Sequence, residues 1–140
     1  MTAVKKTYRS KISLGILIFI ILVFVISGFV IIDSNVKNNF GVAVYVLTIL
    51  FIAYLFVTTN YTIYNQQTLI VKSGFLMNKK IDINSITKIS KTNNPISSPA
   101  LSLDRIEIFY NKYDSVIISP KNEQEFIQDL HKINSSIIIN

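Results

Sequence analysis

The 140-residue sequence contains no cysteine and no tryptophan, and it has one histidine, four glycines and three prolines. Without cysteine the chain cannot form a disulfide, a thiolate nucleophile, a zinc ribbon or an iron–sulfur cluster. His131 alone cannot build a histidine-rich metal site, and a serine–histidine–aspartate triad would depend on it. No GxxxxGKS, GxxxxGKT or GxGxxG pattern occurs that could cradle a phosphate. These absences predict a protein that is not an enzyme, with no catalytic, cofactor-binding or metal-ligating residue.

Charge is also scarce, at 16% of residues against about a quarter in an ordinary soluble domain. Residues 12–32 carry none, and as a helix they would span about 31 Å, close to the thickness of a hydrocarbon core. The run is longer than the apolar core of a cleaved signal peptide, and it ends in Ile-Ile-Asp-Ser-Asn rather than at a small-residue cleavage site. We therefore expect a first transmembrane helix over residues 12–32.

A second apolar run covers residues 40–57, and with Thr58 and Thr59 at the interface it predicts a second transmembrane helix over residues 40–59. The polar connector between them, residues 33–39, is only long enough to reverse the chain. The two segments therefore predict a transmembrane hairpin. Because neither carries a charged residue, transport by this chain alone is not expected.

The distribution of Lys and Arg predicts the orientation of the hairpin. Residues 1–11 form a basic tail, whereas the connector has only Lys37 beside Asp33. The positive-inside rule then predicts a two-pass protein of the cell membrane with both termini in the cytoplasm and the connector outside. Four basic residues of the tail are the expected anchor flanks of the first helix: Lys5, Lys6, Arg9 and Lys11.

From residue 60 the continuous apolar pattern changes to alternation, which predicts short strands over residues 60–64, 68–72, 75–83, 86–90, 103–110 and 115–119. Residues 91–102, rich in Asn, Ser and Pro, predict a loop. Asn122 followed by Glu125 predicts a capping box, and Phe126, Leu130 and Ile133 form the apolar stripe of a C-terminal helix. The expected fold class is α+β: a two-helix transmembrane hairpin followed by a small β-barrel or sandwich with a capping helix.

Residues 135–140 are expected to form a C-terminal tail. Its apolar segment, residues 137–139, has three interpretations: a frayed end, an added strand, or a contact with lipid or a partner.

Several segments of the region 61–133 match one known pattern. They are Tyr61-Thr62-Ile63-Tyr64, Leu69-Ile70-Val71 with Gly74, Ile81-Asp82-Ile83 with Ile86, Ser98-Pro99 followed by Ala-Leu-Ser-Leu-Asp-Arg-Ile-Glu-Ile at 100–108, and Ser119-Pro120-Lys121 before Phe126 and Leu130. In these residues the chain resembles a bacterial PH-like domain family of small membrane-anchored proteins. The resemblance implies a seven-stranded PH-like barrel with a capping helix over residues 60–134. It implies no catalytic residue and no particular ligand.

Because the barrel would follow the second helix directly, its near side is expected within about a Debye length, ~8 Å, of the headgroups. Five basic residues are the candidate contacts with anionic lipid: Lys72, Lys79, Lys80, Lys88 and Lys91. The alternative, which the small net charge of this region favours, is that they are solvated lysines that discourage edge pairing.

Arg105 also has two interpretations. It is either an anion-binding fork, which would make it a further lipid contact, or a structural residue that binds loop carbonyls while Ser102 or Asp104 caps the loop. The structural interpretation is favoured, because polar residues at the start of a strand often organise loops. The loop at 92–102 is the candidate recognition surface.

These observations predict a non-catalytic binding or scaffolding module at the cytoplasmic membrane surface, whose ligand is a protein partner, including a second copy, or an anionic lipid. Two alternatives stay open. One is an immunity protein that protects its own cell from a membrane-active bacteriocin, and the other is an accessory subunit of a transporter or channel. Neither nucleic acid nor a small-molecule substrate is indicated as a partner.

Overall fold

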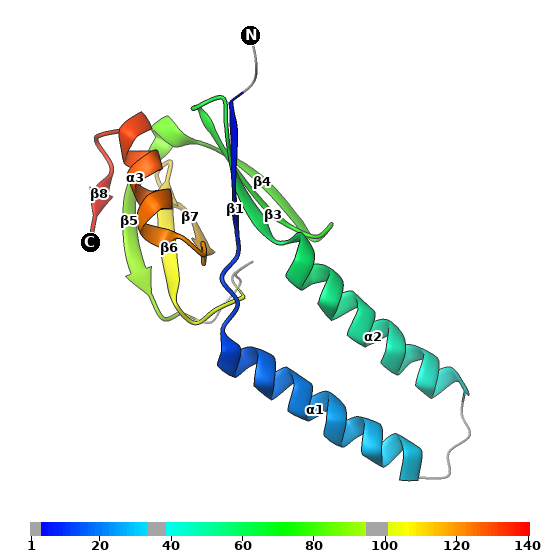
Figure 1. Cartoon of the computed structure of the whole chain (residues 1–140). Coiled ribbons are helices and arrows are strands. Elements are labelled where there is room, and N and C mark those ends of the chain that lie inside the picture. The colour runs from blue at the N-terminus through cyan, green and yellow to red at the C-terminus, as the bar shows by residue number, and fades with distance from the viewer. Residues whose placement is uncertain (1–3, 34–38, 95–100) are drawn as a thin grey trace.

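The computed structural model describes residues 4–33, 39–94 and 101–140 (Figure 1). Two long helices extend from a small domain of two sheets and one helix, which confirms the predicted α+β class. The elements in chain order are β1 (Lys5–Arg9), α1 (Leu14–Asp33), α2 (Asn39–Thr58), β2 (Asn60–Tyr64), β3 (Thr68–Ser73), β4 (Met77–Asp82), the 3-10 turn η1 (Ile83–Ser85), β5 (Ile86–Thr92), β6 (Arg105–Tyr110), β7 (Asp114–Ile118), α3 (Glu123–Ile133) and β8 (Ile138–Ile139).

The strands of the described residues form two four-stranded sheets, ordered β1-β2-β3-β4 and β7-β6-β5-β8, which makes eight strands where the resemblance implied seven. We call the two sheets together the barrel. All pairs are antiparallel except β5 with β8. Alternate side chains point inward, as the period of two requires, and they meet in one core that includes Leu69, Val71, Ile89 and Ile108. The helix α3 covers this core with Phe126 and Leu130, both fully buried.

The N-terminal segment differs most from the sequence prediction. Residues expected to be a basic tail form β1, which pairs with β2 from Lys5 opposite Tyr64 to Arg9 opposite Asn60. Only Tyr8 of this strand is buried, where its ring meets Phe126 edge-on at 5.1 Å. The strand has one core residue and three basic ones, so its composition is that of a cytoplasmic tail. Its pairing partner, β2, follows the helical hairpin in the sequence. The hairpin is therefore an insertion between two neighbouring strands of the barrel.

The C-terminal segment also belongs to the domain. Ile137 is buried in the core, and β8 pairs in parallel with β5 through Lys88 opposite Ile138. Of the three interpretations of residues 137–139, the structure contains the added strand. The Asn134 amide, buried at the end of α3, donates to the carbonyls of Ile83 and Ile86 at 3.0 and 3.2 Å and so ties this end to η1.

The start of α3 corrects a smaller prediction. Asn122 occupies the N-cap position, but its side chain makes no cap hydrogen bond to the helix backbone. It donates instead to the Glu125 carboxylate at 3.1 Å, so the expected capping box is not formed.

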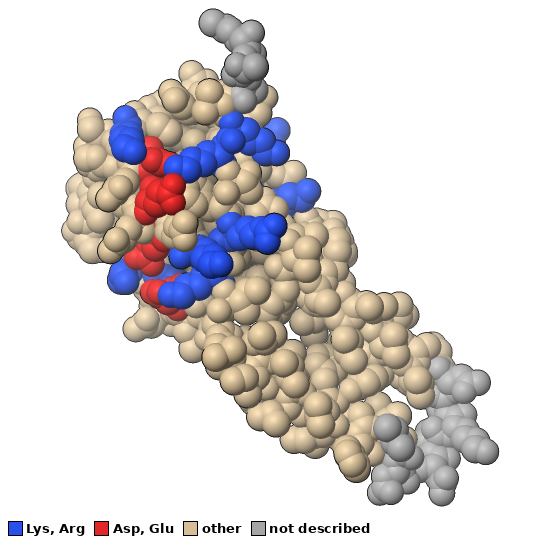
Figure 2. Space-filling view, viewed as in Figure 1, with Lys and Arg blue, Asp and Glu red and all other residues tan. Residues whose placement is uncertain are grey.

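The two long helices run side by side away from the barrel (Figure 1). Their apolar windows, Leu14–Ile31 and Phe40–Thr58, have mean hydropathies of 3.2 and 2.5 and are long enough to cross a membrane. Figure 2 shows charged side chains on the barrel and a continuous uncharged surface along the helices. Residues 34–38, which include the connector's Lys37, lie outside the described residues.

Candidate membrane interface

Both long helices join the same end of the barrel through short segments, residues 10–13 before α1 and residue 59 after α2. The Ser10 amide donates to the Thr59 carbonyl at 3.4 Å, so the chain entering α1 is bonded to the chain leaving α2. The Lys11 amide donates to the Ser119 carbonyl at 2.6 Å, and the Ser13 amide to the Leu101 carbonyl at 3.2 Å. These residues define the base of the barrel, the end from which both helices extend.

Buried hydroxyl groups reinforce this junction. The Tyr61 hydroxyl donates to the Ser10 hydroxyl at 3.1 Å and accepts from the Ser119 amide at 3.2 Å, while the hydroxyls of Ser10 and Ser119 lie 3.1 Å apart. The Thr59 hydroxyl donates to the Leu55 carbonyl in the last turn of α2 at 2.7 Å. Burial raises the pKa of the Tyr61 hydroxyl, which therefore stays a neutral donor.

We name Ser10, Thr59, Tyr61 and Ser119 the junction cluster. All four residues are buried, and each buried hydroxyl has a hydrogen-bond partner, which is the condition under which polar groups are stable in a core. The cluster joins β1, α2, β2 and the end of β7, so it holds the helical hairpin and the barrel as one unit.

Acidic partners pair with one predicted anchor flank, Lys11, and one predicted lipid contact, Lys91, at the base. The Lys11 ammonium lies 2.5 Å from the Asp104 carboxylate, and the hydrogen bond between them lowers the pKa of Asp104 and raises that of Lys11. The Lys91 ammonium lies 3.7 Å from Asp104 and 3.5 Å from Glu123. These pairs reduce the positive charge that the base presents to a membrane.

Arg105, the other candidate anion contact, is 8% exposed. Its Nε donates to the Ser102 carbonyl, and one terminal nitrogen donates to the Asn94 carbonyl at 3.0 Å. The Ser102 hydroxyl accepts from the Asp104 amide at 3.2 Å. These contacts support the structural interpretation, because the guanidinium joins two carbonyls that flank residues 95–100. Those six residues, the larger part of the predicted recognition loop, lie outside the described residues.

The structure does not bring the remaining predicted lysines together. Lys72 pairs with Asn60 at the base, and Lys80, opposite Ile70, shares its face of the sheet. Lys79 points to the other face, with its ammonium 5.2 Å from the centre of the Tyr110 ring. Lys88 lies in the second sheet beside the Phe109 ring. Since β4 is an edge strand, Lys79 and Lys80 fit the alternative interpretation of lysines that discourage edge pairing.

Two of the four predicted anchor flanks also lie away from the base. Lys5 and Lys6 begin β1, so Lys6 is about 10 Å farther from the two long helices than Arg9 at the strand's end. The Lys6 ammonium instead pairs with α3, 2.8 Å from Glu125 and in contact with Asp129. The other two predicted flanks, Arg9 and Lys11, lie near the start of α1: Arg9 ends β1, and Lys11 lies between β1 and α1.

Asp129 is the centre of this contact between β1 and α3. It accepts hydrogen bonds from the Lys6 ammonium and, at 2.6 Å, from the Tyr8 hydroxyl. These two donors lower the pKa of Asp129 to about 2. Burial, followed by the bond to Asp129, raises the pKa of Tyr8. The interaction holds the first strand against the capping helix.

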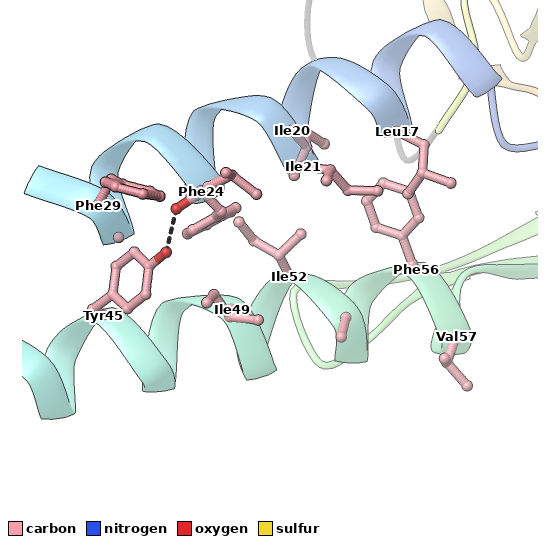
Figure 3. A pocket seen from close by; sticks show the side chains of 13 residues that line it. Leu17, Ile20, Ile21, Phe24, Phe29, Tyr45, Ile49, Ile52, Phe56 and Val57 are labelled. Carbon is pink, nitrogen blue, oxygen red and sulfur yellow. Dashed lines mark hydrogen bonds between the residues drawn. The ribbon is translucent and has the colours of Figure 1, made fainter. Parts of the chain in front are cut away.

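An apolar groove of about 740 Å³ runs between α1 and α2 (Figure 3). At one point the helices approach closely: the Tyr45 hydroxyl donates to the Phe24 carbonyl, and a Cβ at Gly28 would lie 2.9 Å from the Tyr45 oxygen. Toward the barrel, Ile21, Ile52 and Phe56 point between the helices and line the groove. The hairpin therefore does not fill its own interior.

The family model described as the bacterial PH domain matches residues 59–134, more than half of the chain. The chain belongs to the bacterial PH-domain family. The resemblance drawn from the sequence is thereby confirmed, and PH domains are in general non-catalytic binding modules. No curated protein and no solved structure matches the sequence. The matched region begins just before β2, so β1, which completes the first sheet of this PH domain, precedes the matched residues and is separated from them by the hairpin.

The junction cluster was not predicted from the sequence. Serine and threonine are common at the ends of helices and strands, so their hydroxyls at residues 10, 59 and 119 carried no distinguishing signal. Thr7 and Tyr8, residue types that are common in strands, were the available sign of a strand, but the positive charge of the segment indicated a membrane flank instead.

Proposed function

We propose that the protein is a non-catalytic scaffold that holds its bacterial PH domain against the cytoplasmic face of the cell membrane. The observation that carries this proposal is the insertion of the helical hairpin between β1 and β2, fixed by the junction cluster. Because the anchoring hairpin is part of the chain between two paired strands, the barrel keeps one constant orientation to the bilayer. Both helices leave from the base, so the segments before and after the hairpin lie on the same side, as the predicted topology requires.

Among the ligands considered, a membrane-protein partner has the strongest support. Lipid contact by basic residues is limited, because Lys11 and Lys91 are paired with acids and Arg105 is buried. The groove between α1 and α2, in contrast, offers apolar surface within the membrane segment. Helices associate in bilayers through close packing, and two helices that leave a groove can obtain that packing from a third. This favours a role as accessory subunit of a larger membrane protein.

Crosslinking from the groove tests this proposal. Because the chain has no cysteine, Ile52→Cys places a unique thiol in the groove, to which a benzophenone group can be attached in native membranes. Leu47→Cys is the matched control, since Leu47 is exposed on α2 and is not part of the groove lining. We expect irradiation to attach the Ile52 derivative to a transmembrane segment of one membrane protein and the Leu47 derivative to lipid.

Three other results would contradict the proposal in different ways. Attachment of both derivatives to lipid alone would reject a protein in the groove. Attachment of the Ile52 derivative to a second copy of the chain would show self-association in place of a different partner protein. Equal attachment of both derivatives to many proteins would show that the groove has no selectivity.

A further inference from the structure

The turn between β3 and β4, residues 74–76, carries two large apolar side chains that the barrel core does not use. Phe75 is 72% exposed and Leu76 is 61% exposed. Both lie at the base, because β3 and β4 run antiparallel with Ser73 opposite Met77, and Lys72 pairs with Asn60 beside the end of α2. We name residues 74–76 the apolar turn.

The apolar turn extends past the end of α2 and lies along the side of that helix. The Phe75 ring lies 6.0 Å from the Phe51 ring and 6.3 Å from the Tyr54 ring, centre to centre. Phe51 precedes Thr58, the last residue of α2, by seven residues, which is about 10 Å of helix. The ring of Phe75 is therefore located beside the apolar segment of α2 rather than above it.

Gly74 permits this close approach. Its φ is +53°, and a Cβ at this position would lie 2.9 Å from both the Leu55 Cδ2 and the Tyr54 Cε1 atoms. A side chain here would both strain the backbone and push the turn off the helix. The local sequence is thus fitted to a turn that contacts α2.

Polar groups border the apolar turn on the barrel side. Lys72 and Asn78 face each other across the two strands, and the Ser73 hydroxyl lies 3.0 Å from the Thr59 hydroxyl of the junction cluster. A lysine stem can lie along apolar surface while its ammonium reaches the headgroups. The boundary between polar and apolar side chains therefore falls just above Phe75 and Leu76.

We infer that the apolar turn is a third membrane contact, which inserts Phe75 and Leu76 at the boundary between headgroups and acyl chains in the leaflet that faces the barrel. The bilayer is the occupant of this surface because the turn is continuous with the apolar surface of α2. The interfacial layer on each side of the hydrocarbon core is about 6 Å thick. The Phe75 ring lies beside both Phe51 and Tyr54, about 6–10 Å below the end of α2, so it reaches the boundary with the acyl chains while the turn backbone stays near polar groups. The inference rests on the membrane anchoring in the proposed function.

Single-tryptophan variants of the full-length protein test this inference, because the natural chain has no tryptophan. Phe75→Trp and Leu76→Trp report on the apolar turn. Leu22→Trp, within α1, reports on the anchor, and Tyr113→Trp reports on an 87% exposed residue of the β6–β7 turn. Each variant is reconstituted into phosphatidylcholine–phosphatidylglycerol vesicles whose lipids carry bromine either near the headgroup end or near the far end of the acyl chain.

We expect the two turn variants to show blue-shifted emission that is quenched more by the bromine near the headgroup. Leu22→Trp should be quenched more by the deep bromine, and Tyr113→Trp should be quenched by neither. Water-like, unquenched emission from both turn variants, with Leu22→Trp still quenched, would overturn the inference and leave the anchor intact. Unquenched emission from Leu22→Trp would overturn the membrane anchor itself, and the inference with it.

Discussion

The Ser10 amide donates to the carbonyl of Thr59, although the entire helical hairpin separates the two residues in the sequence. On the barrel side of this bond, β1 and β2 form an antiparallel pair. On the other side, the chain leaves the barrel as α1 and returns as α2. A module attached by one flexible linker can rotate relative to the bilayer. Here two short connections leave from one end of the barrel, so the helical hairpin and the PH domain are joined at two points.

Removal of the Tyr61 hydroxyl should weaken this connection. In Tyr61→Phe, the Ser119 amide loses its acceptor and the Ser10 hydroxyl loses a donor within a buried site. An unsatisfied buried group of this kind costs about 1–3 kcal/mol. We expect a lower free energy of unfolding for the detergent-solubilised protein, measured by circular dichroism in denaturant.

Tyr64→Phe is the matched control, since Tyr64 ends the same strand and is exposed. We expect it to change the unfolding free energy little. If the two variants behave alike, the junction cluster does not contribute to stability as described.

The Asp129 contact predicts a specific dependence of stability on pH. Its pKa is lowered from 3.8 to about 2 in the folded protein, so the ionised carboxylate stabilises the fold above pH 3.8, and this contribution is lost as the pH falls toward 2. Asp129→Asn should reduce the unfolding free energy at neutral pH by about 1 kcal/mol, since the contact is partly solvated. The difference between the natural protein and this variant should shrink between pH 3.8 and pH 2. A difference that stays constant over this interval would show that ionisation of Asp129 is not the cause.

Gly74 and Gly41 provide a matched pair for the contact between the apolar turn and α2. An alanine Cβ at residue 74 would meet two side chains at 2.9 Å with a φ of +53°, whereas a Cβ at residue 41 would meet nothing within 4 Å. We expect Gly74→Ala to lower the melting temperature, with a cost of at least about 1 kcal/mol. Gly41→Ala, within helix α2, should leave stability unchanged or raise it. Equal melting temperatures for the two variants would argue against a close contact at Gly74.

Cysteine labelling should distinguish the two orientations of the hairpin. Val36→Cys places a thiol in the predicted external connector, and Tyr113→Cys places one on the exposed β6–β7 turn of the barrel. In intact cells, a membrane-impermeant maleimide should label the first variant and should label the second only after the membrane is permeabilised. The reverse pattern would place the PH domain outside the cell.

Much of the fold could be predicted from the sequence because most elements are marked by their own residues. The uncharged runs predicted both long helices, and alternation predicted strands within a few residues of β2, β3, β5, β6 and β7. The stripe of Phe126 and Leu130 predicted the buried face of α3. The candidate site was predicted less well, because the role of a lysine depends on which acid lies near it. Lys11 and Lys91 share Asp104, and Lys6 contacts Asp129, through pairings between distant segments.

The sequence by itself determined that the chain has two apolar helices and a PH domain, since burial periodicity and hydropathy are local properties that a few neighbouring residues display. Only the tertiary structure decided that the helices are inserted in the sequence between two paired strands, β1 and β2. It also decided that the basic N-terminal residues are the first strand and that Phe75 lies against α2. These relationships depend on contacts between segments far apart in the chain. A strand such as β1, with Tyr8 as its one buried side chain, takes its structure from the partner with which it pairs.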